Sequence, residues 1–266
     1  MQKDLVIIRT DGGFCSQIAF YALGKYFEDK GFCVKYDMEF FKKYGVGAAT
    51  YLTDKAFPNL KIILATDDEV KLYKDKYHRK NQSLDKCKPP IYIDGYPEER
   101  PFLFIKYKDF FSKEFIFDTD DREQKALLEE IKKNNSCCVH IRRGDLVKNG
   151  CYGKVADKEY FLKAIHIISK TNNNVYFYFF SDEINWVKEN IIPHISHLNY
   201  KICDKNGLDK SHLDLYLATW CKYIISSNGS LGLYAKVLSH SQNTQLYTPK
   251  YWDYMCKSTE LNKISI

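Results

Sequence analysis

Short apolar runs alternate with longer amphipathic segments at the beginning of the chain. Residues 5–8 form a continuous apolar run that is followed by a pair of glycines, a pattern that is typical of a buried strand leading into a turn. Apolar residues recur at helical spacing over residues 14–29, and residues 32–36 form a second apolar run. A strand, a helix and a strand within about forty residues predict a parallel βαβ unit.

The same alternation returns after residue 121 and continues to residue 239. It predicts strands over residues 137–141, 175–180, 198–202 and 223–226, and helices over residues 122–133, 157–169, 182–190, 212–220 and 230–239. Strands that alternate with helices at this spacing predict a parallel sheet with helices on both faces. The ligands of such sheets bind at the carboxyl ends of the strands.

The pattern is less regular over residues 38–121. This stretch holds five of the seven prolines, many lysines and short aromatic clusters, and we expect mixed short helices, one or two strands and long loops. Polar stretches at residues 118–123 and 132–136 are candidate boundaries. We therefore expect two α/β halves with a cleft between them, an N-terminal half over residues 1–121 and a C-terminal half over residues 122–266.

Composition narrows the class of protein. With 45% hydrophobic and 28% charged residues, the chain is typical of soluble globular proteins and not of disordered ones. The net charge of +6 comes from 40 basic residues interleaved with 34 acidic ones, without a block of five or more Lys or Arg. This balance suits an anionic ligand or a membrane surface. It argues against a nucleic-acid-binding protein, which would carry clustered basic stripes.

The spacing of the cysteines and the length of the apolar runs indicate where in the cell the chain resides. The nine cysteines include no CxxC pair, which argues against a disulfide framework and against a zinc site. We expect reduced thiols in a cytosolic compartment. The first apolar run is too short for a signal peptide, and no segment approaches the roughly eighteen apolar residues of a membrane-spanning helix.

Polar side chains follow three of the predicted strands at the point where each strand ends. Because the carboxyl ends of parallel strands meet at one edge of a sheet, we expect these side chains to lie close together. They are Arg142, Arg143 and Asp145 after strand 137–141, Ser181, Asp182 and Glu183 after strand 175–180, and Ser227, Asn228, Gly229 and Ser230 after strand 223–226. His140 alternates with Arg142 and therefore shares its face of the strand.

Two adjacent arginines at a strand end suit a diphosphate. The planar fork of arginine pairs bidentately with phosphate and keeps its proton, and Gly144 leaves room for a close approach. The sequence SSNGS before an apolar helix adds free backbone amides at a helix N-terminus, which favours an anion. These features predict a phosphorylated ligand. Asp182 and Asp214 are candidates to accept hydrogen bonds from a nucleotide base or ribose.

Each of these features also has a purely structural interpretation. Adjacent arginines form solvated or salt-bridged turns, and SSNGS can be a simple turn. Asp182 suits the N-cap of the helix that follows, and Ser211 with Asp214 fits a capping box. His140 in an apolar strand can be a core histidine whose hydrogen bonds are satisfied. The sequence alone leaves these alternatives open.

Four ordered blocks resemble the α-1,2-fucosyltransferases, glycosyltransferase family 11, of the bacterial type without a membrane anchor. The family hallmark HxRRGD stands intact at residues 140–145. The other blocks are Gly-Gly-x-x-x-Gln at Gly12, Gly13 and Gln17, Phe-Ser-Asp-acid at 180–183 with Trp186 and Lys188, and Asp-Leu-x-Leu at 214–217 before Cys221 and the Ser-Asn-x-Ser loop at 227–230. Related fucosyltransferases of other linkage share HxRRxD, so this motif indicates GDP-fucose more firmly than the acceptor.

The resemblance implies a GT-B-like enzyme of two Rossmann-like halves with a donor cleft between them. Its C-terminal half would bind GDP-fucose and its N-terminal half would face the acceptor. Arg142 would clamp the β-phosphate, and Arg143 and Asp145 would support or orient it. The implied catalytic residues are Arg142, Asp145 and His140. The implied donor-binding residues also include Asp182 and Asp214 near the guanosine, Ser227, Asn228 and Ser230 near the diphosphate, and Gly12, Gly13 and Gln17 in a loop that closes over the donor. The family needs no metal and no further cofactor.

The implied reaction is transfer of L-fucose, with inversion, to the 2-hydroxyl of a terminal galactose. Partners would be GDP-fucose and a galactose-terminated oligosaccharide or lipid-linked glycan, without nucleic acid, in the cytoplasm or in peripheral contact with the inner face of the membrane. The chain has GGFCSQ where the family commonly has GGLGNQ, and SSNGSLGLYA where a Ser-Trp-Trp-Gly run is frequent. Acceptor choice therefore stays open. The sequence does not identify the general base: Asp11 and Asp37 follow strands of the N-terminal half and are candidates, but a cap or turn residue is the simpler interpretation of each. Another GDP-sugar or linkage, or a non-catalytic carbohydrate- or anion-binding module, remains an alternative.

Overall fold

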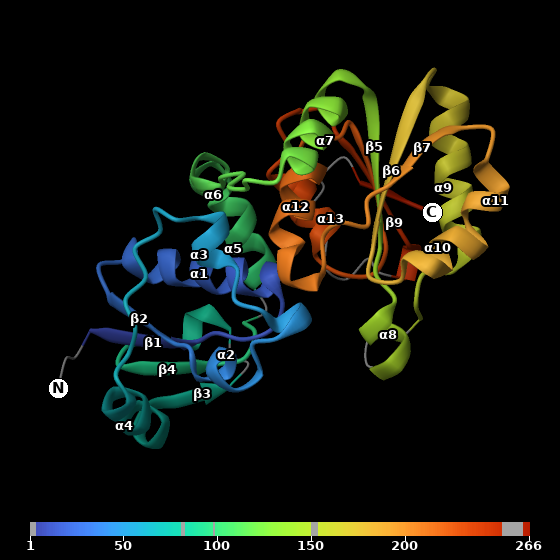
Figure 1. Ribbon diagram of the computed structural model, residues 1–266. Helices are drawn as coiled ribbons and strands as arrows, with labels where there is room; N and C mark the ends of the chain where they lie inside the picture. Colours follow the sequence, from blue (N-terminus) through green and yellow to red (C-terminus); the bar gives the residue numbers. More distant parts are fainter. Residues whose placement is uncertain (1–3, 81–82, 98, 150–153, 252–262) are drawn as a thin grey trace. The chain divides into compact units, whose positions relative to one another are not determined.

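The computed structural model describes residues 4–80, 83–97, 99–149, 154–251 and 263–266. The chain forms two compact units, Met1–Ile116 and Phe117–Ile266, and each contains one parallel β-sheet (Figure 1). All seven cysteines of the described residues are free thiols. Within the same residues, no helix combines the length and the hydropathy needed to cross a membrane.

The N-terminal unit contains a four-stranded sheet in the order β2-β1-β4-β3. Its strands are all parallel and comprise β1 (Leu5–Arg9), β2 (Cys33–Asp37), β3 (His78–Lys80) and β4 (Ile91–Asp94). Strand β1 lies between β2 and β4, with Val6 opposite both Val34 and Ile91. This central position buries β1 on both faces and explains its continuous apolar run.

Helices cover both faces of this sheet. Leu5 and Ile7 pack against Tyr73 of α4 on one face, whereas α1 lies on the other face (Figure 1). The helices are α1 (Phe14–Glu28), α2 (Glu39–Tyr44), α3 (Thr53–Ala56), α4 (Asp67–Tyr77), α5 (Arg100–Lys106) and α6 (Lys108–Glu114), with 3-10 turns η1 (Gly47–Ala49) and η2 (Leu84–Lys86). Short helices and two short strands are thus what the irregular middle of the chain forms.

The C-terminal unit contains a six-stranded parallel sheet in the order β10-β9-β8-β5-β6-β7. Its strands are β5 (Asn135–Ile141), β6 (Val175–Ser181), β7 (Asn199–Ile202), β8 (Tyr223–Ser226), β9 (Gln245–Thr248) and β10 (Lys263–Ser265). The first four are the predicted strands, and the last two were not predicted. Because β5 pairs with both β6 and β8, the loops that follow these three strands are neighbours.

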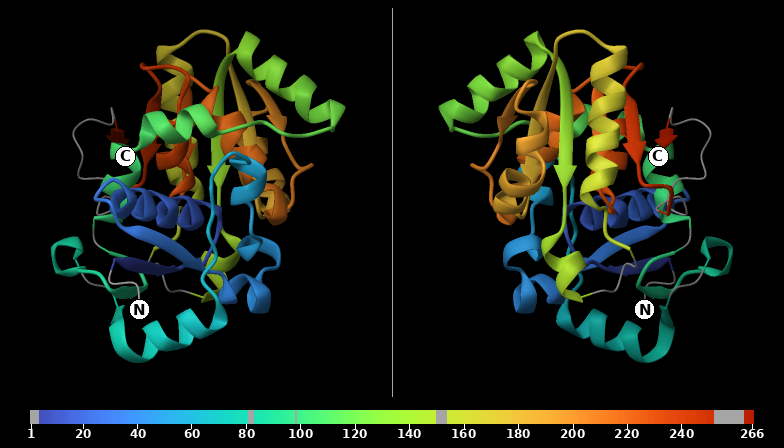
Figure 2. Two further views of the ribbon diagram at one scale, coloured as in Figure 1. Left: turned by 90° about the vertical axis from the view of Figure 1, so that its left-hand side faces the viewer. Right: turned by 90° about the vertical axis from the view of Figure 1, so that its right-hand side faces the viewer.

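The helices of this unit form a layer on each face of the sheet (Figures 1 and 2). One face carries α9, α10 and α11, whose apolar residues, such as Phe161 and Val187, pack on Val139 and Phe177. Figure 1 shows α7, α12 and α13 on the other face. The bounds are α7 (Arg122–Lys133), α8 (Gly144–Asn149), α9 (Lys158–Thr171), α10 (Ile184–Asn190), α11 (Ile192–Ile195), η3 (Leu208–Lys210), α12 (Ser211–Thr219) and α13 (Leu231–Val237).

Candidate functional site

Arg142 lies at the carboxyl end of the central strand β5 and is held side-on by Asp145. Its Nε donates to Asp145 Oδ1 at 2.9 Å and its Nη2 pairs with Asp145 Oδ2. The hydrogen bond from Arg142 is the main reason that the pKa of Asp145 lies below its usual range. Each side chain of the pair is 36% exposed. The pair therefore fixes the direction of a guanidinium that solvent, or a ligand, can still reach.

The loop after β8 fixes the backbone of Arg142. Arg142 N donates to Ser227 Oγ at 2.9 Å, and Ser227 N donates to the carbonyl of His140 at 3.0 Å. Gly229 follows with a φ of +128°, and a side chain there would approach Arg142 Nη1. A residue with a Cβ rarely adopts this φ, so only glycine gives the loop its shape beside the guanidinium.

Asn228, from the same loop, binds a separate segment of backbone. Its Oδ1 accepts from Ala156 N at 3.1 Å and its Nδ2 donates to Lys154 O at 2.7 Å. Ser227 and Asn228 are both buried, whereas Ser230 is partly exposed and directly precedes α13. Ser227 and Asn228 are therefore positioning residues in this geometry, and Ser230 is the polar side chain of the loop that a ligand can reach.

Asp182, at the end of β6, holds the backbone of the HxRRGD loop. Its Oδ1 accepts from Arg143 N at 2.9 Å and its Oδ2 accepts from Gly144 N at 3.1 Å. A Cβ at Gly144 would lie 3.1 Å from the same oxygen, so glycine permits this close approach. Burial raises the pKa of Asp182, and the two N–H donors oppose that shift. The alternative in which Asp182 caps the next helix is wrong, because α10 begins after Glu183 and has no side-chain cap.

Arg143 is enclosed by protein, unlike Arg142. Its guanidinium carbon lies 4.0 Å from the centre of the Trp186 ring, and its Nη1 donates to Ala156 O at 3.3 Å. Its Nε lies 3.5 Å from Glu183 Oε2, and its side chain is only 17% exposed. Stacking on an aromatic ring and pairing with a carboxylate are typical of a structural arginine. The salt-bridged interpretation therefore fits Arg143, whereas Arg142 keeps the accessible guanidinium.

His140 shares the buried end of β5 with these residues. Burial, and secondly the charge of Arg142, lower its pKa to about 3, so the ring is neutral near pH 7. Its Nδ1 is buried and has no hydrogen-bond partner among the residues that the structure describes. The interpretation as a satisfied core histidine is therefore wrong. Because the ring is neutral, the positive charge at the strand end is concentrated on the arginines.

Asp214 lies on α12 and accepts from Asn206 Nδ2 at 2.7 Å. Burial raises its pKa to about 7, a direction that the hydrogen bond from Asn206 opposes. The predicted capping box is wrong, because the N-cap of α12 is Lys210, without a side-chain hydrogen bond. Asn206 was not among the predicted site residues, although its position after strand β7 is the signal that could have indicated it.

Gln17 belongs to the N-terminal unit, and both the oxygen and the nitrogen of its side-chain amide form hydrogen bonds within the protein. Its Oε1 accepts from Leu52 N at 2.9 Å and from Thr53 Oγ1 at 3.1 Å. Its Nε2 donates to Thr50 O at 2.9 Å and to Gly12 O at 3.3 Å. Gln17 is fully buried and therefore positions two loops. Gly13, beside Gly12, is the N-cap of α1.

Asp11, a candidate base, is already paired. Arg9 Nη1 donates to Asp11 Oδ2 at 2.7 Å, and the hydroxyl of Tyr96 donates to Asp11 Oδ1. Arg9 also contacts Asp94 Oδ1 at 3.1 Å. Both carboxylate oxygens of Asp11 therefore already accept hydrogen bonds within the protein, and this geometry does not favour Asp11 as the general base.

No metal centre is formed by the described residues, since none of their His, Cys, Asp and Glu side chains gather in groups of three or more that could hold an ion. Charge for binding an anion is present instead at the ends of β5, β6 and β8. Most of the predicted site residues of the C-terminal unit come together there, namely Arg142, Arg143, Asp145, Asp182, Ser227, Asn228 and His140. Ser230 follows in the same loop and Asp214 lies on α12 of the same unit, whereas Gly12, Gly13 and Gln17 belong to the other unit.

The chain is similar in sequence to known glycosyltransferases. The chain is 26% identical over 276 residues to the alpha-1,2-colitosyltransferase of Escherichia coli, covering 93% of this chain and 92% of that protein. It is 27% identical over 158 residues to galactoside alpha-(1,2)-fucosyltransferase 2 of Rattus norvegicus, covering 56% of this chain and 44% of that protein.

Solved structures and a family profile complete the comparison. The fold is similar to that of NodZ alpha-1,6-fucosyltransferase co-crystallized with GDP, with a TM-score of 0.55 and 15% identity over 90% of this chain and 93% of that chain. This likeness confirms the expected α/β, GT-B-like fold with two parallel sheets. The profile of glycosyl transferase family 11 matches residues 37–264, which include every candidate residue of the C-terminal unit. The chain therefore belongs to glycosyl transferase family 11, the α-1,2-fucosyltransferase family that its sequence blocks resemble.

Proposed function

We propose that the chain transfers L-fucose from GDP-L-fucose to the 2-hydroxyl of a terminal galactose-type residue, with inversion at the fucose anomeric carbon. The observation that carries this proposal is the accessible guanidinium of Arg142, fixed by Asp145 at the end of the central strand β5. Membership of family 11 supports the reaction class. The bound GDP of NodZ, a protein of similar fold, supports the nucleotide.

The chemistry assigns Arg142 to the leaving group. As the bond between the fucose anomeric carbon and the β-phosphate oxygen breaks, negative charge grows on the diphosphate and positive charge grows on the sugar. A preorganised guanidinium stabilises that developing negative charge. Ser230 precedes a helix of only seven residues. We therefore assign to Arg142 the larger part of the stabilisation of the leaving diphosphate. Asp145 and Asp182 act as positioning residues, one through the guanidinium and the other through the loop backbone.

Asp214 is our candidate for the guanine base. Its carboxylate, when ionised, can accept the two adjacent N–H groups of guanine, which a neutral acid does less well. Asn206 holds one of its oxygens. His140 then acts as a neutral neighbour of Arg142 and not as an acid, because its pKa is lowered to about 3.

We assign donor binding to the C-terminal unit and acceptor binding to the N-terminal unit. The acceptor would be a galactose-terminated oligosaccharide or lipid-linked glycan. The free thiols of the described residues suit the reducing conditions of the cytoplasm. Gly12, Gly13 and Gln17 would shape the loop that meets the donor.

A second donor has a specific observation in its favour. The relative that covers 93% of this chain is named for colitose, the sugar that corresponds to L-fucose without its 3-hydroxyl. A site built to hydrogen-bond that hydroxyl rejects the deoxy sugar strongly, whereas an apolar site discriminates little. GDP-L-fucose and GDP-linked colitose should therefore be compared as substrates.

The test starts with binding and ends with the product. GDP should raise the thermal midpoint more than UDP or ADP, and incubation with GDP-L-fucose and terminal galactosides should give a product with a 1,2-linkage by NMR. Arg142→Ala should lower kcat about 100- to 1,000-fold. Arg122→Ala, which removes an exposed arginine at the start of α7, is the matched control and should leave kcat unchanged.

Two results would contradict the proposal. Unchanged transfer by Arg142→Ala would remove the assigned role of this residue. A protein that binds GDP-L-fucose but neither transfers nor hydrolyses it would instead be a non-catalytic binding module.

A further inference from the structure

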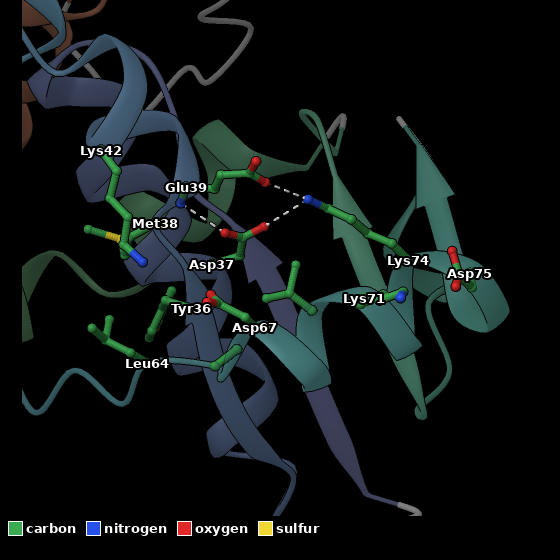
Figure 3. Close-up of a pocket in the computed structure, with 12 residues that line it drawn as sticks. Tyr36, Asp37, Met38, Glu39, Lys42, Leu64, Asp67, Lys71, Lys74 and Asp75 are labelled. Carbon is green, nitrogen blue, oxygen red and sulfur yellow. Dashed lines mark hydrogen bonds and ion pairs between the residues drawn. The ribbon is translucent and has the colours of Figure 1, made fainter.

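A cavity of about 520 Å³ opens in the N-terminal unit at the carboxyl end of β2 (Figure 3). One wall is an extended segment that continues the sheet, since Tyr36 N donates to Ile63 O at 2.9 Å and Ala65 N donates to Tyr36 O at 2.9 Å. Helices α2 and α4 supply the other walls. The four carboxylates that line it are Asp37, Glu39, Asp67 and Asp75.

Asp37 and Lys74 form a rigid polar floor. Asp37 is only 3% exposed, and its carboxylate accepts from Tyr92 Oη at 2.6 Å and from Glu39 N at 2.9 Å. Lys74 Nζ lies 3.4 Å from Asp37 Oδ2 and 2.9 Å from Glu39 Oε2, as the dashed lines of Figure 3 show. Three donors thus engage the buried carboxylate of Asp37, so this geometry does not favour Asp37 as the general base. The contact with Asp37 also fixes the direction of the lysine.

The charges around the cavity select a class of ligand. The lining contains Lys42, Lys71 and Lys74 against four carboxylates, so it carries no excess of positive charge that would favour a phosphate or a sugar acid. It does offer both hydrogen-bond donors and acceptors. Neither Lys42 nor Lys71 takes part in any ion pair found among the described residues, in contrast to Lys74. A lining that offers both donors and acceptors suits the hydroxyl groups of a neutral sugar, because each hydroxyl can donate and accept.

Apolar side chains of the cavity also suit a sugar. Leu64 is 56% exposed at the cavity, and Met38 and Val70 also line it. A pyranose ring has an apolar face of C–H groups that can cover such surface, while its hydroxyl groups meet the charged side chains. The volume lies in the range of roughly 300–1,000 Å³ that is typical of small-molecule sites. The carboxyl end of a parallel strand is also where such folds bind ligands.

We propose that this cavity is a subsite for a neutral sugar unit of the acceptor glycan, with Lys71 and Asp67 as hydrogen-bonding residues and Leu64 as the apolar contact. This inference rests on the proposed function and adds a location and a chemical class to its acceptor. It makes the residues of α4 specificity-determining, and it predicts preference for uncharged glycans over those with a carboxylate or phosphate at the same unit.

The test compares two lysines on one helix. Lys71→Ala should raise the KM for a terminal galactoside such as lactose about tenfold, while kcat and the KM for GDP-L-fucose stay within twofold. Lys71→Arg should keep most of the affinity. Lys76→Ala, on the same helix and exposed but outside the lining, is the matched control. Saturation-transfer NMR of lactose with GDP present should show a signal that Lys71→Ala weakens and Lys76→Ala does not.

Leu64→Gln provides a second variant, because it changes an exposed residue and should not disturb folding. It should raise the KM for lactose as well. If the unmodified chain transfers fucose but Lys71→Ala and Leu64→Gln match it in KM and in NMR signal, the subsite is refuted and the proposed function stands. If the unmodified chain shows no transfer to any galactoside, the proposed function is what fails.

Discussion

Replacement of Asp214 by asparagine should remove much of the pH dependence of stability of the C-terminal unit. The pKa of Asp214 is raised by burial from 3.8 to about 7 in the folded chain. Between these two values the unfolded chain loses this proton while the folded chain keeps it, so unfolding releases a proton. Stability from this group is therefore complete below pH 3.8 and is lost as the pH rises through about 7.

The size of the effect follows from the shift. A change of roughly 3 pKa units corresponds to about 4 kcal/mol at 1.36 kcal/mol per unit. This is an upper value, because Asp214 is partly accessible and water screens its charge. The amide introduced by Asp214→Asn would keep an oxygen that accepts from Asn206 but would carry no charge. The variant should match the unmodified protein near pH 4 and be more stable at pH 8 by up to about 4 kcal/mol.

Urea unfolding at several pH values measures this difference. Tryptophan fluorescence reports the C-terminal unit, because all three tryptophans lie at positions 186, 220 and 252. Asp209→Asn, which neutralises an exposed carboxylate just before the same helix, is the control and should keep the slope of the unmodified protein. Equal slopes for the unmodified protein and Asp214→Asn would refute the raised pKa of Asp214.

Three further outcomes are expected. GDP should bind more weakly at pH 6 than at pH 8, because Asp214 gains a proton as the pH falls below about 7, and calorimetry of Asp214→Asn should show no such change. Asp182→Ala removes the acceptor of the N–H groups of Arg143 and Gly144; it should weaken GDP binding about tenfold, and an effect no larger than that of Asp209→Asn would contradict this role. Gly24→Ala should lower the thermal midpoint of the N-terminal unit, because an added Cβ would lie 1.9 Å from Tyr36 Oη. Adding Tyr36→Phe to this variant should recover part of the loss, and an unchanged midpoint in Gly24→Ala would be inconsistent with this packing.

Periodicity predicted most of the strands and helices because burial enforces it. The middle of strand β5, residues 137–139, is continuously apolar, since neighbours cover it on both edges and both faces. Strands β9 and β10, of four and three residues, escaped prediction. Their identity as strands comes from pairing with residues that are distant in sequence, and not from a local pattern.

The residues of the candidate site could be predicted from the sequence, but the role of each residue within the site could not. Arg142 and Arg143 are the same residue type, and the difference between them arises from Trp186 and Glu183, which follow the neighbouring strand. The local sequence around Asp182 is compatible with a helix cap and also with a side chain that accepts from the backbone N–H groups of a neighbouring loop. The contact with the loop after β5 decides between them. Such choices depend on tertiary contacts that a local pattern does not encode.

The hydrogen bond between Arg142 N and Ser227 Oγ joins residues that are 85 positions apart. During synthesis, the arginines, Asp145 and Asp182 all exist long before the residue that fixes the backbone of Arg142. A growing chain therefore carries the complete HxRRGD motif without the geometry that we assign to it. The ability to bind a diphosphate would then appear late, when β8 pairs with β5, and would mark the completion of the sheet.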